Sequence, residues 1–472
     1  MMKQLKQVIK QVLAALVAMT FTTLWAQQVI KIPRLVRMHT ATDGVRVERD
    51  TIPLPLSLPG MLIEGRDTLS AKGNLETFFS GLDSLRAGKD TVLNIVHLGD
   101  SHIQAGYYSG EMMHLLHAAF GNAGRGWIAP LKLSRSNEAS DYFIKSVIRS
   151  WNVGRITQRE SRQRAPVGLG GVGIQSVSPS INFDVIITPK NGAGYEFNEA
   201  ILYRGARSMP MLPAGENKQA VETFLSDTVL AEGVIADTFR ITMPVDTLQL
   251  QSTRRKQGTD RLLPASTFRN VYYGFSLKNG KPGILYHAVG INGAMYVNYT
   301  DSAYIAQLAL LKPDLLIVSM GTNETFGRRF RAEEFAMQVK AFLSLVKAQM
   351  PQAAILLTTP PECYKRVTVN KKRVFQRNTN TERAAETLVR VAKEEGIACW
   401  DLFSATGGKN SCRKWLHDNL LRRDRIHFTQ IGYEEQATLL FRALMNEYNR
   451  TNGKYCILGR FGMGQTSRNL TI

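Results

Sequence analysis

The apolar and polar positions of this chain follow two different periods. Residues 91–98, TVLNIVHL, form an almost continuous apolar run, and the next stretch, GEMMHLLHAAFGN, carries its apolar side chains on one helical face. This order predicts a buried strand followed by a helix that ends near Gly121. From residue 284 onward, four apolar runs alternate with amphipathic helical patterns: ILYHAVG, DLLIVSMG, AAILLTTPP and IACWDLF. Such alternation is typical of a parallel sheet with helices on both faces, and it predicts a three-layer α/β/α fold.

Residues 123–283 show a different pattern. They contain short strand-like stretches separated by Gly, Pro and Asn: INFDVIITP, GYEFNEAILYRG, DTFRITMPVDTLQLQ and NVYYGFSLKNGKPG. This pattern predicts an inserted β-sandwich. The stretch GLGGVGIQS lacks the lysine and the Ser or Thr of a phosphate-binding loop, so we interpret it as a bend or bulge.

A chain of 472 residues exceeds the size of one hydrophobic core, and these patterns divide it. The predicted parts are a signal peptide at 1–26, a lead-in segment at 27–84, an α/β domain in two pieces at 85–122 and 284–450, the inserted β domain at 123–283, and a C-terminal tail at 451–472. The last helix of the α/β domain is expected from about Thr429 to Tyr448.

The predicted signal peptide contains three lysines, Lys3, Lys6 and Lys10, before an apolar run that is too short to span a bilayer comfortably. The run ends at a small residue, Ala26, so we expect cleavage there and a periplasmic or secreted protein. An uncleaved membrane anchor is the alternative, because Leu24 is a less usual residue three positions before the cut.

The chain is strongly basic, with 59 Lys and Arg against 39 Asp and Glu and a net charge of +20. This balance favours electrostatic attraction to acidic wall polymers or anionic membrane surfaces. The sequence shows no nucleic-acid-binding motif, so nucleic acid is not an expected partner.

The four cysteines are widely spaced, at Cys363, Cys399, Cys412 and Cys456. This spacing fits neither a disulfide scaffold nor a CxxC metal site, and it leaves open whether two of them form one bridge. Metal-ligand spacing is also lacking among His, Asp and Glu, so no metal site is expected.

Three polar clusters stand where loops of the predicted sheet meet. Ser101 follows the first strand, Asn323 follows LLIVSM, and Asp424 and His427 lie in the loop before the last helix. Loops at the carboxyl ends of parallel strands meet at one edge of the sheet, so these side chains are expected to lie close together.

These residue types fit nucleophilic catalysis. His427 can take the proton of the Ser101 hydroxyl, and Asp424 can fix the imidazole tautomer. An oxyanion formed on attack would be stabilised by the backbone N–H groups of Ser101 and Gly293 and by the side-chain amide of Asn323.

Each cluster alone has a simpler interpretation as a turn, a cap or a solvated loop, and only their joint occurrence favours catalysis. Asp100 is expected to tie the turn by accepting hydrogen bonds from backbone N–H groups, and His102 is expected to support the site from beside the nucleophile. His417, next to Asp418, is the rival base.

The blocks GDSH, GINGA, GTNE and DRIH resemble those of the SGNH, or GDSL-like, hydrolase superfamily. The resemblance covers residues 91–125 and 284–447, and it implies a flavodoxin-like hydrolase fold without metal or organic cofactor. Glu324 stands where many members have Asp, at a position that supports the loop.

The stretches GDSHIQAG, FGNAGRGW and HAVGINGA, together with the β-rich insert, are similar to periplasmic peptidoglycan O-acetylesterases with an inserted carbohydrate-binding-like domain. That likeness implies removal of O-acetyl groups from an acetylated glycan through an acyl-serine intermediate. Peptidoglycan is the glycan that it favours. Trp127, Trp151 and Tyr195 could stack on sugar rings, although core or hinge packing is the simpler interpretation.

Two other functions fit the same sequence. One keeps the triad but acts as a lipase, an acetyltransferase or an esterase on other glycans. The other is a glycan-binding surface protein without catalysis, for which the intact Ser101, Asp424 and His427 would have no use. The oligomeric state cannot be derived from the sequence.

Overall fold

The computed structural model describes residues 38–41, 44–47, 51–188, 191–192, 194–226, 229–252, 269–327 and 329–455. The chain divides into two compact units, 1–51 and 52–472. The described part of the first unit is an antiparallel hairpin of β1 (Met38–Ala41) and β2 (Gly44–Val47). The predicted signal peptide, Cys456 and most of the predicted tail lie outside the described residues. Among the described helices, none has both the length and the apolar character needed to cross a membrane.

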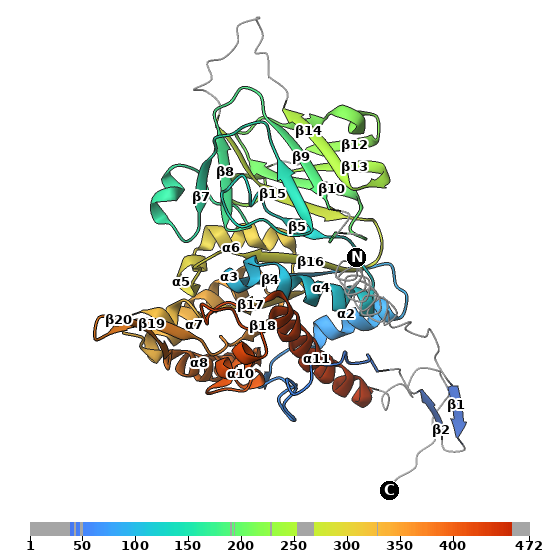
Figure 1. Cartoon of the computed structure of the whole chain (residues 1–472). Coiled ribbons are helices and arrows are strands. Elements are labelled where there is room, and N and C mark those ends of the chain that lie inside the picture. Colours follow the sequence, from blue (N-terminus) through green and yellow to red (C-terminus); the bar gives the residue numbers. More distant parts are fainter. Residues whose placement is uncertain are drawn as a thin grey trace, which may run out of the picture. The chain divides into compact units, whose positions relative to one another are not determined.

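A six-stranded sheet forms the centre of the second unit, in the order β16-β4-β17-β18-β21-β3 (Figure 1). All neighbours pair in parallel except β3, which is antiparallel to β21. Counted from β4, the parallel strands follow the order 2-1-3-4-5, so the flavodoxin-like prediction is confirmed. The strands are β3 (Ala71–Lys72), β4 (Val92–Gly99), β16 (Gly283–Gly290), β17 (Leu315–Ser319), β18 (Ala354–Thr358) and β21 (Ala398–Trp400).

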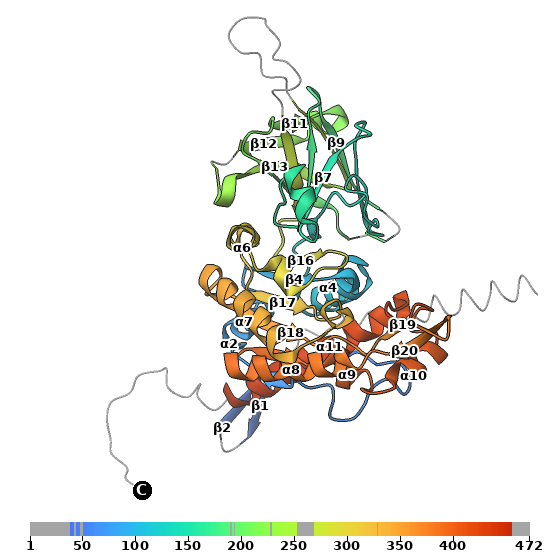
Figure 2. The same ribbon diagram turned by 90° about the vertical axis from the view of Figure 1, so that its left-hand side faces the viewer.

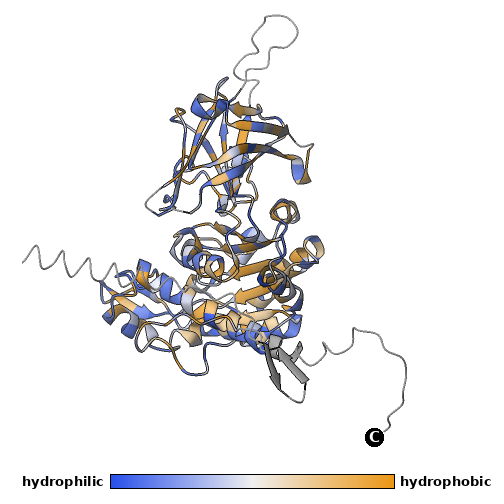
Figure 3. Cartoon of the chain, turned by 90° about the vertical axis from the view of Figure 1, so that its right-hand side faces the viewer, coloured by the Kyte–Doolittle hydropathy of each residue, from blue (hydrophilic) through white to orange (hydrophobic). Residues whose placement is uncertain are grey.

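Helices cover both faces of this sheet. In β17, Leu315 and Ile317 enter one core and Leu316 and Val318 enter the other, because successive side chains of a strand point to opposite faces. Both faces of the sheet are therefore apolar. Figure 3 shows that the central strands consist mostly of hydrophobic residues. Helices on the Leu315 face are α2 (Glu76–Arg86), α3 (Ser101–Gln104), α4 (Tyr107–Phe120), α9 (Leu402–Ala405), α10 (Ser411–His417) and α11 (Gln430–Tyr455). Helices on the Leu316 face are α5 (Tyr296–Tyr299), α6 (Ser302–Leu308), α7 (Ala332–Gln349) and α8 (Asn380–Glu395).

The predicted boundary at residue 84 does not separate two bodies. β3 extends the central sheet, and α2 packs its buried Phe78, Phe79 and Leu82 into the same core as β4. A two-residue edge strand carries too short an apolar pattern to be read from the sequence. The last helix also continues past the predicted end at Tyr448, to Tyr455.

Residues 123–282 form two antiparallel sheets, which agrees with the predicted sandwich (Figure 2). One sheet has seven strands and the other has four. Their inner faces meet at Phe183, whose ring is 4.9 Å from that of Tyr272. The strands are β5 (Gly126–Ile128), β6 (Tyr142–Lys145), β7 (Asn152–Arg155), β8 (Val172–Ser176), β9 (Asn182–Ile187), β10 (Phe197–Gly205), β11 (Met211–Pro213), β12 (Val221–Ser226), β13 (Val234–Val245), β14 (Thr247–Ser252) and β15 (Asn270–Lys278).

The glycine-rich stretch of the sandwich is a tight turn that leads into β8. Gly171 has a φ of +73° and donates a backbone hydrogen bond to Gly168 at 2.8 Å. Side chains would not fit at Gly168 and Gly170, because they would overlap the rings of Tyr273 and Trp127. Glycine is therefore needed here for close packing, in agreement with the predicted bend. Trp127 and Trp151 are themselves buried in the core rather than displayed for sugars.

One hairpin was not expected from the sequence. β19 (Tyr364–Val369) and β20 (Lys372–Arg377) follow β18 and pair antiparallel. Asn370 and Lys371 form the two-residue turn with φ values of 49° and 61°, which is the backbone sign of the turn type that closes tight hairpins. The sequence gives only a weak strand signal here: Val367 and Val369 alternate with Thr368 before this Asn, but three successive cations at residues 371–373 follow it.

The three described cysteines, Cys363, Cys399 and Cys412, are buried free thiols. A disulfide among these three is therefore absent from the described part of the chain.

We predict that Gly290→Ala lowers the free energy of unfolding by about 1–3 kcal/mol. A methyl group at residue 290 would overlap the backbone of Ile103 and Gln104. Gly110→Ala, inside α4, is the control, because its methyl group would meet no atom within 4 Å outside the helix's own backbone. This substitution should raise the free energy of unfolding by about 0.5–1 kcal/mol. Urea unfolding of both variants measures these changes, and equal effects would contradict the close contact at Gly290.

Candidate active site

Ser101 lies where the chain leaves the central sheet. β4 ends at Gly99 and α3 begins at Ser101. The Asp100 carboxylate caps this turn by accepting a hydrogen bond from the His102 N–H at 2.9 Å. Asp100 thus makes the kind of backbone contact that the sequence predicted for it.

Asp424 and His427 lie in one loop between α10 and α11, and the structure brings this loop to Ser101. Ser101 Oγ is 3.0 Å from His427 Nε2, and His427 Nδ1 is 2.9 Å from Asp424 Oδ2. The other carboxylate oxygen of Asp424 accepts the backbone N–H of Ile426 at 2.9 Å and that of His427 at 3.0 Å. The three predicted residues therefore form a continuous hydrogen-bonded chain.

The charge of Asp424 is held by these contacts. Partial burial opposes ionisation, but the hydrogen bonds from His427 and Ile426 outweigh it and keep the pKa of Asp424 well below its usual value. An ionised carboxylate at this position stabilises the imidazolium that forms when His427 takes a proton.

The loop is also fixed from outside the triad by Arg425, which has a left-handed φ of 60°. Its guanidinium lies 4.3 Å from the ring centroid of Phe375 and 5.3 Å from that of Tyr364. The Tyr364 N–H donates to the Arg425 carbonyl at 3.0 Å. The β19–β20 hairpin therefore supports the triad loop, a contact that the sequence analysis missed because it missed the hairpin.

The two predicted oxyanion donors besides Ser101 differ in their present bonding. Gly293, with a φ of +76°, lines the cleft beside Ser101, and its N–H has no hydrogen-bond partner among the described residues. The Asn323 side-chain amide donates to Asp100 Oδ2 at 3.1 Å and to the Ala294 carbonyl at 3.0 Å. Both amide hydrogens are thus engaged, and donation to an oxyanion would require one of these bonds to be exchanged. Its predicted role stays a prediction.

Buried polar side chains next to the triad make hydrogen bonds that hold its loops in place. Burial raises the pKa of Asp100 and of Glu324 to about 7 in each case. Glu324 accepts the Tyr296 N–H at 2.8 Å, so it supports its loop as the sequence suggested. His102 bonds through Nδ1 to the Tyr433 hydroxyl at 3.0 Å, and its ring is 5.5 Å from that of His427.

The rival base, His417, is not at the site. Its side chain is 88% exposed and lies 2.8 Å from Asp418, at the end of α10. His417 is not among the residues that line the cleft around Ser101.

The triad opens into a cleft of about 590 Å³. Tyr107, Phe326 and Arg422 line it from the α/β domain. Asn137 and Glu138 line it from the inserted segment, in the loop between β5 and β6. The insert therefore contributes part of the cleft wall, and no sequence pattern marked these two residues.

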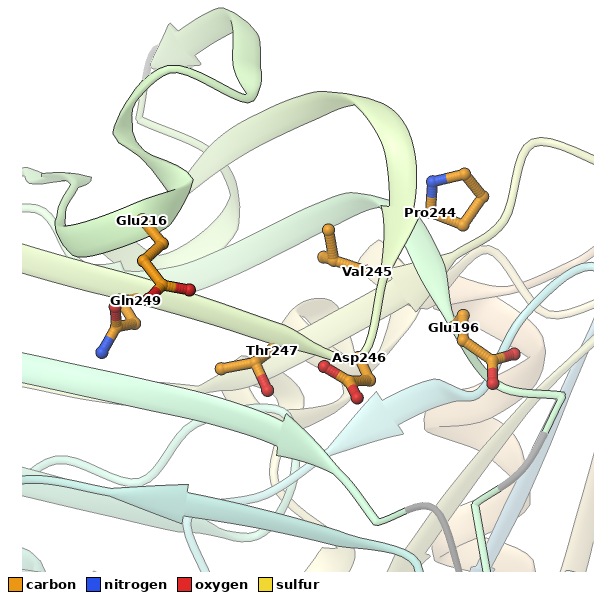
Figure 4. Close-up of a pocket in the computed structure, with 7 residues that line it drawn as sticks. All are labelled: Glu196, Glu216, Pro244, Val245, Asp246, Thr247 and Gln249. Atoms are coloured by element: carbon orange, nitrogen blue, oxygen red, sulfur yellow. The ribbon is translucent and has the colours of Figure 1, made fainter.

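A second cavity of about 430 Å³ lies in the β-sandwich, away from the triad (Figure 4). Three carboxylates border it, from Glu196, Glu216 and Asp246. Across the residues that the structure describes, no group of three or more His, Cys, Asp or Glu side chains has the arrangement of a metal site. Nothing at this cavity therefore points to a bound cation.

Part of the α/β domain is similar to a known protein family. Residues 260–435 match the model of the GDSL-like lipase/acylhydrolase family. This part of the chain is therefore similar to GDSL-like lipases and acylhydrolases. The match begins after Ser101, and the inserted sandwich separates the first strand of the α/β domain from most of the matched residues.

Solved structures that are similar to this chain include the following three. A peptidoglycan O-acetylesterase is 20% identical with a TM-score of 0.61, and the alignment covers 83% of this chain and all of that one. A two-domain esterase active on acetylated mannans is 11% identical with a TM-score of 0.35, over 82% of this chain and 57% of that one. A lipase/acylhydrolase from Enterococcus faecalis is 18% identical with a TM-score of 0.26, over 35% and 77%. No curated protein matches the chain.

We predict that His427→Ala lowers kcat on an aryl acetate by about 10²- to 10⁴-fold, because the Ser101 hydroxyl loses its proton acceptor. His417→Ala is the matched control and should leave kcat unchanged. Steady-state kinetics of the two purified variants show which histidine acts as the base. A larger fall in kcat for His417→Ala than for His427→Ala would mean that the histidine 3.0 Å from Ser101 is not the base.

Proposed function

We propose that this protein is a serine esterase that removes O-acetyl groups from carbohydrate, with peptidoglycan as its substrate, through an acetyl-serine intermediate. The observation that carries the proposal is the chain of contacts from Ser101 through His427 to Asp424, at 3.0 Å and 2.9 Å. The likeness of fold, over most of the chain, to a solved peptidoglycan O-acetylesterase supports the choice of polymer.

In the first half of the reaction, Ser101 Oγ attacks the acetyl carbonyl carbon while His427 Nε2 takes the hydroxyl proton. The negative charge on the carbonyl oxygen is met by the N–H groups of Ser101 and Gly293. The intermediate then collapses, the bond to the sugar oxygen breaks, and His427 returns its proton to that oxygen.

In the second half, His427 takes a proton from a water molecule, whose oxygen attacks the carbonyl carbon of the acetyl-serine. Acetate leaves, and Ser101 Oγ regains its proton from His427. Asp424 keeps the imidazole in the tautomer that both halves need.

The lining of the cleft supports a short acyl group. Its aliphatic side chains, among the described residues, are those of Ala105 and Ile426, and most other lining groups are polar or aromatic. A lipase would need a longer apolar channel for its acyl chain. The alternative of a binding protein without catalysis leaves the aligned triad unexplained.

The substrate also implies a location outside the cytoplasm, in the periplasm or beyond, which the apolar run after Lys10 supports. Recovery of the protein in the cytoplasmic fraction alone would contradict this part of the proposal.

We predict that the purified protein releases acetate from O-acetylated peptidoglycan and that Ser101→Ala abolishes the release, because no other hydroxyl in the described cleft contacts His427. Acetate is measured enzymatically, with base-treated, deacetylated peptidoglycan as the blank. Release that persists in Ser101→Ala would refute the proposed nucleophile.

We further predict that kcat/KM on aryl esters falls as the acyl chain lengthens from two to eight carbons, because the cleft offers few aliphatic contacts to a longer chain. A profile that rises toward eight carbons would favour a lipase instead.

A further inference from the structure

The β19–β20 hairpin is the most one-sidedly charged element near the triad. Residues 364–377, YKRVTVNKKRVFQR, contain six Lys and Arg and no Asp or Glu. In Figure 1 the hairpin extends away from the central sheet. Its position beside the triad loop raises the question of what its cations bind.

Contacts within the protein account for the cations at the base of the hairpin. Arg377 pairs with Glu362 and Glu382, and Lys365 donates to the Thr325 carbonyl at 2.8 Å. Arg366 lies over the ring of Phe375 at 5.1 Å. Because an isolated two-stranded hairpin is only marginally stable, these contacts and the Arg425 stack explain why it persists.

The tip is different. Lys371, Lys372 and Arg373 are exposed, and their side chains make no hydrogen bond or ion pair within the described part of the chain. Two exposed valines flank them, with Val369 52% and Val374 41% exposed. The tip therefore offers positive charge and apolar surface that no described part of the chain covers.

The register of the hairpin decides which side is free. Directly opposed residues share a face, so Val369 with Lys372 and Val367 with Val374 lie on the same side as Lys365. The opposite side holds Tyr364 and Phe375, against which Arg425 packs.

This free side is continuous with the catalytic cleft. The Lys365 ammonium is 5.9 Å from the ring centroid of Phe326, and Phe326 lines the cleft that contains Ser101. A strip of alternating apolar and cationic side chains therefore runs from the cleft rim to Lys372.

We propose that this strip binds the carboxylate-bearing peptide stems of the polymeric substrate and holds a glycan strand at the mouth of the cleft. The inference rests on the proposed function, since peptidoglycan carries such carboxylates beside its sugars. Charge complementarity favours this occupant, because the strip is cationic and the peptide stems carry carboxylates. The base of the hairpin contacts Arg425, in the loop that carries Asp424 and His427, so a strand bound along the strip would approach the cleft.

The test compares Lys371→Ala/Lys372→Ala with a control of equal charge change, Lys89→Ala/Lys281→Ala, at two exposed lysines outside the hairpin. For the hairpin variant, the ratio of kcat/KM on O-acetylated peptidoglycan to kcat/KM on an aryl acetate should fall by about 3- to 30-fold through KM. The variant Lys371→Arg/Lys372→Arg, which keeps both positive charges, should have the same ratio as the parent protein. In 0.5 M salt the difference from the parent should largely disappear.

A binding assay separates failure of this inference from failure of the proposed function. Ser101→Ala protein is sedimented with purified, deacetylated sacculi, with and without the two hairpin substitutions. Binding that needs Lys371 and Lys372, and that is lost when the stem carboxylates are amidated, supports the inference even where no acetate is released.

Three results would overturn the inference. One is a fall in aryl acetate activity equal to that on the polymer, which would mean that the hairpin only props the triad loop. Another is sacculus binding that is the same for the hairpin and control variants. The last is lysine-dependent binding to anionic phospholipid vesicles but not to sacculi, which would make the hairpin a membrane contact.

Discussion

The site depends on the register in which three parallel strands end. Gly99 of β4 pairs with Gly290 of β16 on one side and with Ser319 of β17 on the other. The loops that carry Ser101, Gly293 and Asn323 therefore begin at the same level of the sheet. Gly99 and Gly290 also leave space for the α3 turn, because a side chain at either residue would collide with it. Once this edge is set, the triad needs only one more loop, and Asp424 and His427 supply it together.

Side chains bind these loops to one another after the register has aligned them. The Asn323 amide reaches both the Asp100 carboxylate and the Ala294 carbonyl, so it ties the Ser101 turn to the Gly293 loop. The backbone N–H of Asn292 donates to Gln104 at 2.7 Å, which is a second tie between the same two loops. These ties hold the Gly293 loop, whose Gly293 N–H is an oxyanion donor in the proposed reaction, in place before charge develops on a substrate. The hairpin then fixes the fourth loop from outside through Arg425.

Most of the fold could be predicted from the sequence because buried parallel strands are apolar on both faces. The triad could be predicted because Ser101 follows a recognisable strand and because Asp424 and His427 precede a recognisable helix. β3 could not be predicted, since its two residues form a strand only against β21. Asn137 and Glu138 were also missed, because their approach to the cleft is set by the packing of the insert rather than by a local pattern. The hairpin was missed because its short apolar alternation, at Val367 and Val369, is followed by three successive cations at residues 371–373. These gaps concern the surroundings of the reactive groups, where tertiary contacts decide which side chains meet.

The sandwich interrupts the domain at a point where the chain leaves and returns through adjacent residues. The Ile284 N–H donates to the Gly121 carbonyl at 2.9 Å, and Ala123 donates back to Ile284 at 3.1 Å. During synthesis, β4 leaves the ribosome well before its neighbour β16, by about 10 to 40 s at ordinary rates of elongation. The nucleophile is therefore made early and its base last. A copy whose synthesis stops before Asp424 would have Ser101 but neither Asp424 nor His427, so the proposed triad requires synthesis to continue more than 300 residues past its nucleophile.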